Sequence, residues 1–328
     1  MSGDRRAVLL VACLLGCAGT DDTDPPADGT SRDGASTRAS EDSEAPPATS
    51  TTGSDGSSEA TSALDTTAAV GGSSTGSDLC DPARTEVDRP DDTDLPQVHV
   101  VYALPSDGRD RGLDTNGTLA ASVEVWNAWL ADRAGGDGLR IDTCGGDVDV
   151  TFFVLDRTDA EVAAEGAYVR EEIEAGLEAA GRIEPHKLYA VYYDGSSTYA
   201  CGGGAFPPAL VGRVGALYLR GTPPGAPRCP QDFAAPGGEA GYLEHAMLHE
   251  LLHSIGLVAT CGATSDGAGH ATDDPSDLMY SGPRPWFPTQ LDPGNDDYWL
   301  HDDPDCPDLE GSALRSPMPD DAWFPEGW

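Results

Sequence analysis

The sequence has few basic residues for its length. It contains 19 lysines and arginines against 57 acidic residues, which gives a formal net charge of −38 at pH 7, and Lys187 is its only lysine. A nucleic-acid-binding protein needs a basic face that displaces counterions from phosphates, so the composition excludes this class. It equally excludes a polybasic module that binds an anionic membrane surface.

Long apolar runs are also missing. The sequence contains no stretch of 18 apolar residues, which a transmembrane helix would need. No aromatic residue precedes Tyr102. From 18 to 78 the chain consists almost wholly of small, acidic, hydroxyl-bearing and proline residues. Such a segment cannot bury enough apolar surface to offset the entropy lost on ordering. We therefore predict a disordered acidic tether over residues 18–94 and one folded domain over residues 95–328.

Residues 1–17 have the parts of an export signal, namely two arginines, ten mostly apolar residues (Ala7–Gly16) and then Cys17. Leu14–Cys17 resembles the lipobox of bacterial lipoproteins, whose cysteine becomes the acylated first residue of the mature chain. The stretch Leu10–Cys13 fits the same pattern after a shorter apolar run, and an ordinary cleaved signal is a third alternative. We expect an exported lipoprotein of the cell surface or outer membrane, anchored through Cys17, with plain secretion as the alternative.

The remaining cysteines are scattered along the chain, at Cys80, Cys144, Cys201, Cys229, Cys261 and Cys306. None forms a CxxC pair, so their spacing favours disulfides over a thiolate zinc site. An oxidising compartment agrees with the export signal. Fifteen pairings are open. We expect Cys201–Cys229 and Cys261–Cys306, because each would hold a segment rich in Gly and Pro.

Hydrophobic patterns predict an α/β (α+β) domain in which helices flank a mixed sheet and an irregular part follows at the C-terminus. The expected strands are Gln97–Leu104, Val148–Leu155, Lys187–Tyr193 and Ala209–Leu219. The first expected helix has an apolar face of Leu119, Val123, Trp126 and Leu130. The second begins at a capping box on Thr158 and buries Val162, Val169, Ile173 and Leu177. The last covers roughly residues 239–255, and Cys201–Gly204 is expected to be a flexible turn.

The last helix contains the one pattern that indicates chemistry, His249-Glu250-Leu251-Leu252-His253. Histidines at i and i+4 lie on one face of a helix, so both imidazoles can reach the same Zn²⁺. Glu250 lies next to the first ligand and can accept a proton from a zinc-bound water. The pattern predicts that His249 and His253 bind the metal and that Glu250 is the general base.

This part of the chain resembles the metzincin group of zinc peptidases. His249, Glu250, His253 and Gly256 match the signature HExxHxxGxxH, and Asp277–Tyr280 resembles the Met-turn. The resemblance implies a zincin-like fold with an active-site helix, one catalytic Zn²⁺, and a metalloendopeptidase that hydrolyses a protein or peptide substrate. The wider stretch His270–Tyr280, followed by Leu291–Tyr298, also looks like a set of exported bacterial proteins of this zincin type.

The chain departs from the metzincin signature at the third histidine, where Ala259 cannot bind a metal. We expect His270 to supply the third ligand, since the small, Gly-rich residues from 260 to 269 can bring it back over the helix. Asp273 or Asp277 could orient its second ring nitrogen. The rivals as third ligand are the carboxylates Asp266, Asp273 and Asp274.

Other polar residues are expected to lie around the site or to stabilise the fold. We interpret His245 as a neighbour of the site, His99, His186 and His301 as structural, and Tyr280 and Tyr298 as packing residues near the zinc. Two acidic loops could hold Ca²⁺, one with Asp273, Asp274 and Asp277 and the other with Asp292, Asp296 and Asp297. Two alternatives to a peptidase stay open: a non-catalytic binding or adhesion module with a zincin fold, and a zinc hydrolase of non-peptide amides.

Overall fold

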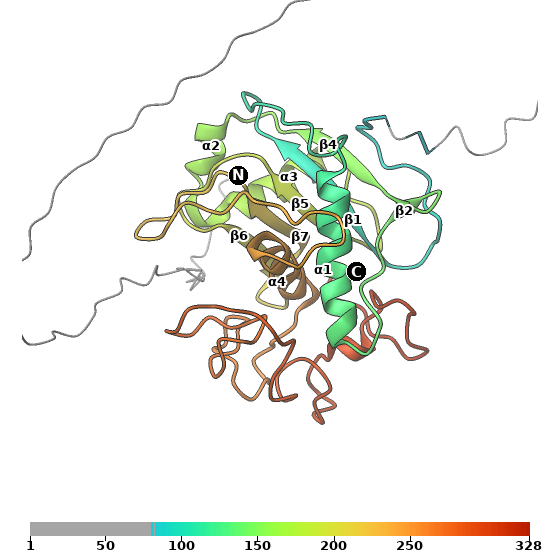
Figure 1. The fold of residues 1–328 in the computed structure, drawn as a ribbon, viewed down its shortest axis with the longest axis vertical. Coiled ribbons are helices and arrows are strands. Elements are labelled where there is room, and N and C mark those ends of the chain that lie inside the picture. The colour runs from blue at the N-terminus through green and yellow to red at the C-terminus, as the bar shows by residue number, and fades with distance from the viewer. Residues whose placement is uncertain (1–79, 82) are drawn as a thin grey trace, which may run out of the picture. The chain divides into compact units, whose positions relative to one another are not determined.

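A five-stranded sheet forms the centre of the computed structural model, which describes residues 80, 81 and 83–328 (Figure 1). The export signal, Cys17 and the tether up to residue 79 lie outside the described residues. The strands follow the order β4-β1-β5-β7-β6, and only β6 runs antiparallel to its neighbour. Their bounds are β1 Gln97–Leu104, β4 Val150–Val154, β5 Lys187–Tyr193, β6 Gly202–Phe206 and β7 Leu210–Tyr218. A two-stranded hairpin, β2 Thr143–Cys144 and β3 Asp147–Val148, precedes β4.

Helices cover both faces of this sheet (Figure 1). Helices α1 (Thr118–Arg133) and α4 (Tyr242–Ile255) share one apolar core with the sheet, and α2 (Asp159–Ala163) and α3 (Val169–Ala179) share a second. The strands supply both cores because successive side chains point to opposite faces. In β1, Val98 and Val100 face α1 and α4, whereas Val101 faces α3. This is the α/β arrangement of a mixed sheet between helices that the sequence predicts.

Most expected elements occur close to their predicted positions. Strands β1 and β5 have the predicted bounds, and the capping box on Thr158 begins α2. The second helix is not continuous, because Gly166 adopts a left-handed φ of 61° and a 3₁₀ turn, η2 (Gly166–Tyr168), separates α2 from α3. The four residues of its predicted apolar face are nevertheless all buried. None of the helices among the described residues is long and apolar enough to cross a membrane.

The flexible turn predicted for Cys201–Gly204 is wrong, because these glycines begin strand β6 at the edge of the sheet. The absence of side chains lets α4 approach the strand closely. A methyl group on Gly204 would lie 2.6 Å from His253 Cβ, and one on Gly202 would lie 2.5 Å from Glu250 Oε1. The glycines are therefore required by packing against the helix rather than by flexibility.

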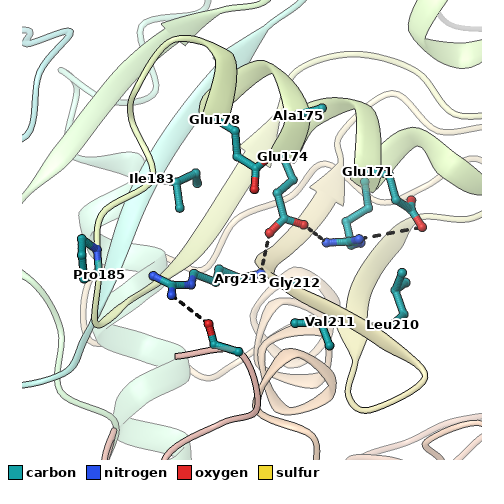
Figure 2. A pocket seen from close by; sticks show the side chains of 12 residues that line it. Glu171, Glu174, Ala175, Glu178, Ile183, Pro185, Leu210, Val211, Gly212 and Arg213 are labelled. Carbon is teal, nitrogen blue, oxygen red and sulfur yellow. Dashed lines mark hydrogen bonds and ion pairs between the residues drawn. The ribbon is translucent and has the colours of Figure 1, made fainter. Parts of the chain in front are cut away.

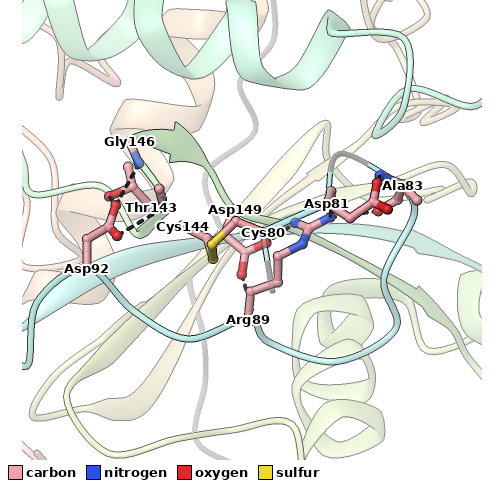
Figure 3. Close-up of a disulfide and its surroundings, with 10 residues drawn as sticks. Cys80, Asp81, Ala83, Arg89, Asp92, Thr143, Cys144, Gly146 and Asp149 are labelled. Carbon is pink, nitrogen blue, oxygen red and sulfur yellow. Dashed lines mark hydrogen bonds and ion pairs between the residues drawn. A yellow bond between two sulfur atoms is a disulfide. The ribbon is translucent and has the colours of Figure 1, made fainter. Parts of the chain in front are cut away.

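The segment from Cys80 to Asp94, which the sequence analysis assigns to the tether, packs against the domain. A disulfide joins Cys80 to Cys144, and the guanidinium of Arg89 pairs with buried Asp149 (Figure 3). The carbonyl of Thr85 accepts a hydrogen bond of 2.8 Å from Phe152 N in β4. The packed part of the chain thus begins at least as early as Cys80, and this segment adds to the β4 edge of the sheet.

The chain after α4 is irregular, as predicted, and its regular structure is limited to the short 3₁₀ helix η3 (Leu309–Gly311). Disulfides Cys201–Cys229 and Cys261–Cys306 form as the sequence analysis expects. The second of these joins the loop that follows α4 to the C-terminal segment. It therefore restrains, over a separation of 45 residues, a region that has no sheet or long helix of its own.

Candidate metal centre

Helix α4 carries the predicted site and is held firmly at both ends. Glu244 accepts a hydrogen bond of 3.0 Å from Gly241 N at its start and another of 2.8 Å from Ser122 Oγ in α1. The helix ends at Gly256, which adopts a left-handed φ of 95°. In its last turn, the hydroxyl of Ser254 lies 3.0 Å from Val214 O and accepts a hydrogen bond of 3.0 Å from Ala205 N. These contacts fix the helix against α1, β6 and β7.

Three histidines converge on one point. His253 Nε2 lies 3.0 Å from His249 Nε2 and 2.9 Å from His270 Nε2. All three side chains are buried, and together they form a group whose nitrogen atoms lie within 4.8 Å of one another. The structure thus brings His270 to the two histidines of the helix, as the sequence analysis expects.

The chemistry of this group fits a cation. His249 Nδ1 lies 2.8 Å from Leu278 O. Because a carbonyl oxygen can only accept, Nδ1 is the donor and Nε2 keeps a lone pair. Three neutral imidazoles cannot make two good hydrogen bonds through three facing Nε2 atoms, and an extra proton is disfavoured because burial and nearby His270 lower the pKa of His249 to about 3. Burial also holds the pKa of His253 well below its ordinary value. A divalent metal with affinity for imidazole, such as Zn²⁺, satisfies all three lone pairs.

The turn after Asp277 contacts the ring of His249. The backbone N–H of Met279 donates to Asp277 Oδ1 at 2.5 Å, and this bond shapes the turn that presents Leu278 O to His249. The indole N–H of Trp286 donates to the same carbonyl at 3.1 Å. The indole also packs edge-on against His249, with 5.7 Å between the ring centroids. Met279 itself is fully buried. Sequence reasoning missed Trp286, since no spacing signal connects it with the helix.

A different carboxylate from the expected ones orients His270. Asp266 Oδ2 lies 3.4 Å from His270 Nδ1, and Asp266 Oδ1 accepts a hydrogen bond of 3.2 Å from His270 N. The bond to His270 helps to lower the pKa of Asp266 to about 2, although burial acts in the opposite direction. Asp277 instead shapes the Met279 turn, and Asp273 accepts a hydrogen bond from Thr264. Asp266, weighed in the sequence analysis as a rival ligand, lies behind the ring of His270.

Glu250 is buried against the glycines of β6. Burial raises the pKa of its carboxyl to about 8, while the charge of Arg170 and a hydrogen bond from the Gly204 backbone act in the opposite direction. Its side chain is 4% exposed. A carboxyl in such a place can exchange a proton near neutral pH, and a nearby cation would favour its ionised form.

The other residues singled out from the sequence do not join the histidine group. His245 packs edge-on against Trp129 at 5.1 Å, and His301 bonds to Pro307 O at 3.2 Å. Tyr298 donates to Asp277 Oδ1 at 2.7 Å, and the hydroxyl of Tyr280 accepts from Arg284 N at 3.1 Å. Both tyrosines are buried and hold loops in place, in agreement with their predicted packing role.

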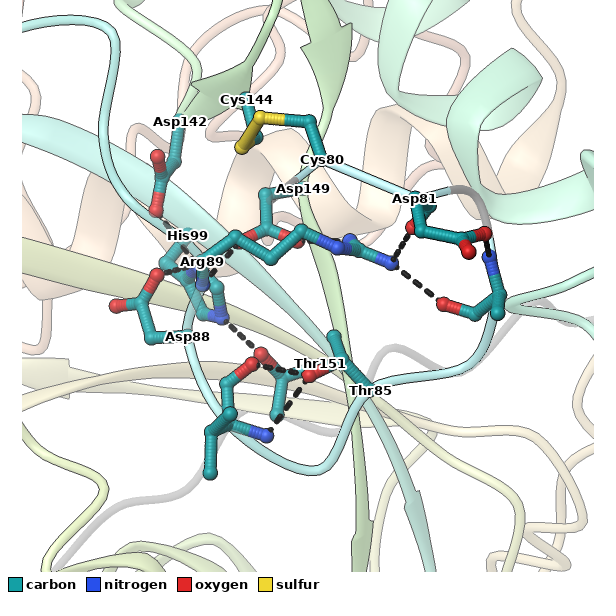
Figure 4. Close-up of polar contacts among 12 residues, drawn as sticks. Cys80, Asp81, Thr85, Asp88, Arg89, His99, Asp142, Cys144, Asp149 and Thr151 are labelled. Carbon is teal, nitrogen blue, oxygen red and sulfur yellow. Dashed lines mark hydrogen bonds and ion pairs between the residues drawn. A yellow bond between two sulfur atoms is a disulfide. The ribbon is translucent and has the colours of Figure 1, made fainter. Parts of the chain in front are cut away.

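His99 belongs to a second group of potential ligands (Figure 4), but the carboxylates of this group already form ion pairs with basic side chains. Its ring bonds to Asp142 Oδ2 at 2.6 Å and to Thr151 Oγ1 at 2.8 Å. Lys187 Nζ lies 2.8 Å from the same oxygen of Asp142, and Arg89 pairs with Asp149. The network buries Lys187, the only lysine of the chain, among carboxylates. It also attaches the segment from Cys80 to Asp94 to the sheet.

A surface pocket of about 610 Å³ lies between α3 and β7 (Figure 2). Arg170 pairs with Glu174 there, and Glu174 Oε1 accepts a hydrogen bond of 2.6 Å from Arg213 N. None of the three histidines lines this pocket. Its carboxylates Glu171 and Glu174 are paired with Arg170, so the histidine group remains the better candidate for chemistry.

No protein-family model and no curated protein sequence matches this chain. Among solved structures, archaemetzincin from Methanopyrus kandleri is similar at 16% identity, with a TM-score of 0.31 over 56% of this chain and 80% of the other. Catalytically inactive OgpA from Akkermansia muciniphila, in complex with an O-glycopeptide substrate, is similar at 17% identity, with a TM-score of 0.38 over 66% of this chain. Wild-type OgpA gives the same identity and coverage with a TM-score of 0.36. This chain spans 62% of the length of OgpA.

Proposed function

We propose that this protein is a zinc-dependent peptidase in which His249, His253 and His270 hold the metal and Glu250 is the general base. The observation that carries the proposal is the convergence of three buried Nε2 atoms beside a buried carboxyl on the same helix. When bound, zinc supplies Lewis acidity, which polarises a carbonyl and lowers the pKa of water.

The residues of the chain have separate tasks in this reaction. Glu250 accepts the proton of the attacking water at a carboxylate oxygen and then donates it to the nitrogen of the leaving amine. The backbone of Gly204 and the charge of Arg170 stabilise the ionised carboxylate that this first transfer needs. Leu278 O and Asp266 keep the His249 and His270 rings oriented with Nε2 toward the metal.

The position of β6 favours a peptide as the substrate. This strand forms the edge of the sheet and pairs on one side only, with β7, among the described residues. Its glycines lie directly against Glu250 and His253. An extended peptide can pair with such an edge through its backbone, which would place one of its amide bonds beside the histidines. This geometry favours a peptidase over a hydrolase of small non-peptide amides.

A non-catalytic binding or adhesion module is the second candidate function. A purely structural zinc site has no use for a general base, and burial of an ionisable Glu250 is costly. The retention of this carboxyl next to a metal ligand therefore favours catalysis.

We also propose that an acyl chain on Cys17 anchors the protein at the outside of the cell and that residues 18–79 separate the domain from the membrane. The acidic, aromatic-free composition of this segment supports the proposal.

Hydrolysis of a casein or peptide library, measured together with zinc content, tests the peptidase. We expect about one zinc per chain in the wild type. Glu250→Gln should retain the zinc and lose activity by roughly 10²–10⁴-fold, because it removes the base but no ligand. His270→Ala should weaken zinc binding by at least about tenfold. Full activity of the Glu250→Gln variant would refute the mechanism, and normal zinc affinity of His270→Ala would exclude it as a ligand.

A further inference from the structure

A third group of potential ligands lies in the irregular segment and contains only carboxylates. Asp292, Asp296 and Asp297 each place an oxygen within 4.8 Å of the others. Asp292 and Asp297 are buried, at 5% and 1% exposure, whereas Asp296 faces solvent. Two buried carboxylates at this separation repel each other strongly unless a positive charge lies between them.

The carboxylate of Asp292 is fixed in place by hydrogen bonds to only one of its two oxygens. Its Oδ2 accepts three backbone hydrogen bonds, of 3.1 Å from Asp297 N, 2.9 Å from Tyr298 N and 3.0 Å from Trp299 N. Its Oδ1 is buried and has no hydrogen-bond partner. A buried oxygen of this kind costs free energy unless it finds a donor or a cation. Because Oδ2 is fully used, Oδ1 is the oxygen of Asp292 that is free for a ligand.

The group differs in this respect from the carboxylates around His99. There, Lys187 and Arg89 form ion pairs with Asp142 and Asp149. Among the described residues, no lysine or arginine forms an ion pair with Asp292, Asp296 or Asp297. Burial raises the pKa of Asp277, and the charges of Asp292 and Asp297 raise it further. Asp277 Oδ2 is buried without a partner.

We propose that Asp292, Asp296 and Asp297 form a Ca²⁺ site. All the side-chain donors are oxygens, which suits a hard divalent cation and not Zn²⁺, whose ligands here are imidazoles. Ca²⁺ accepts irregular geometry and carbonyl or water oxygens in addition to carboxylates. Mg²⁺ requires a near-octahedral shell at shorter distances, which a segment with backbone-fixed Asp292 supplies less readily.

The site would stabilise the turn at Met279 and the loop that leads to His270. Asp297 accepts hydrogen bonds from Thr264 N at 2.7 Å and Thr264 Oγ1 at 2.5 Å, which joins the segment to the loop that leads to His270. Tyr298, the next residue, donates to Asp277, and Asp277 shapes the Met279 turn. Bound Ca²⁺ would therefore hold two segments that orient His249 and His270. The Ca²⁺ site itself does not depend on the proposed peptidase activity.

Thermal unfolding of the whole protein tests the proposal. The protein is freed of metals, reloaded with one equivalent of zinc and titrated with CaCl₂, and a parallel series uses MgCl₂. We expect a saturable rise in Tm of roughly 5–10 °C at a Ca²⁺ concentration 100-fold above Kd, and a much smaller rise with Mg²⁺. Isothermal titration should give one Ca²⁺ per chain.

Matched variants locate the effect. Asp292→Asn and Asp296→Asn should each weaken Ca²⁺ binding by at least about tenfold, whereas Asp321→Asn, an exposed carboxylate elsewhere in the tail, should not. Because Asp296 is exposed, its variant should fold even if Asp292→Asn does not. His253→Ala, which lacks a zinc ligand, should keep the Ca²⁺-dependent rise and thereby separate the two sites. No rise in the wild type, an undiminished rise in Asp296→Asn, or an equal rise with Mg²⁺ would overturn the proposal.

Discussion

The contact between Gly204 and helix α4 can be tested by a single methyl group. A Cβ on this residue would lie 2.6 Å from His253 Cβ and closer still to the carbonyl oxygen of Glu250. Carbon atoms normally approach no closer than about 3.4–4 Å. The obstacle includes helix backbone, so a change of side-chain rotamer cannot remove it. Gly204→Ala must therefore increase the separation between β6 and α4.

Two opposing effects set the size of the change. Overpacking of this kind costs about 1–3 kcal/mol. Alanine recovers about 0.4–1 kcal/mol by restricting the unfolded chain, since Gly204 has no left-handed φ that alanine would disfavour. With the middle of each range, the expected net loss in the free energy of unfolding is about 1 kcal/mol, or roughly 2–4 °C in Tm. A shift of about 1 Å at His253 would also lower peptidase activity by about 10²-fold.

Gly176→Ala in α3 is the matched control. A methyl group there would make ordinary contacts, of 3.6 Å with Phe153 and 3.7 Å with Leu155. Alanine also favours a helix interior over glycine by about 1 kcal/mol, so this variant should be neutral or more stable. Differential scanning calorimetry and peptide hydrolysis of both variants provide the comparison. Equal effects of the two substitutions, or a Gly204→Ala variant with wild-type stability and activity, would refute the packing argument.

Two further predictions concern pH and the anchor. Burial, with a smaller effect of Arg133, lowers the pKa of His245 to about 4. Below about pH 6.5 the unfolded chain therefore binds a proton that the folded chain excludes. The folded state loses stability as the pH falls from about 6.5 to about 4. In urea unfolding of metal-free protein, His245→Leu should reduce the stability difference between pH 8 and pH 5 by up to about 2 kcal/mol, and an unchanged difference would contradict this assignment. Cys17→Ser should move the protein from the membrane to the soluble fraction, because each buried methylene of an acyl chain contributes about 0.8 kcal/mol. A variant that stays with the membrane would reject Cys17 as the anchor.

The parts of the site that the sequence predicted are those set by local geometry. The spacing of His249 and His253 fixes their common face on any helix, and Gly256 marks the end of that helix. His270 was expected because Ala259 has no donor atom and the intervening loop is rich in small residues. These inferences need only the chain between residues 249 and 270.

The parts that the sequence did not predict depend on contacts between distant segments. Asp266, rather than Asp273 or Asp277, lies behind His270, and composition does not distinguish the three carboxylates. The boundary at residue 95 fails to include the packed segment from Cys80 for a similar reason. That segment has little apolar surface, and it is held by a disulfide and an ion pair, each with a residue about 60 positions away.

The two kinds of structure in this domain have different consequences for the site. The sheet and α4 position His249, Glu250 and His253 through buried apolar packing, which does not require a metal. His270 lies in a segment without a strand or long helix, where carboxylates, a disulfide and hydrogen bonds act together with apolar packing against the core. Loss of that support would move one ligand while leaving the helix and its two ligands in place. The position of the third ligand thus depends on the irregular segment, and a cation bound at Asp292 would act on that segment.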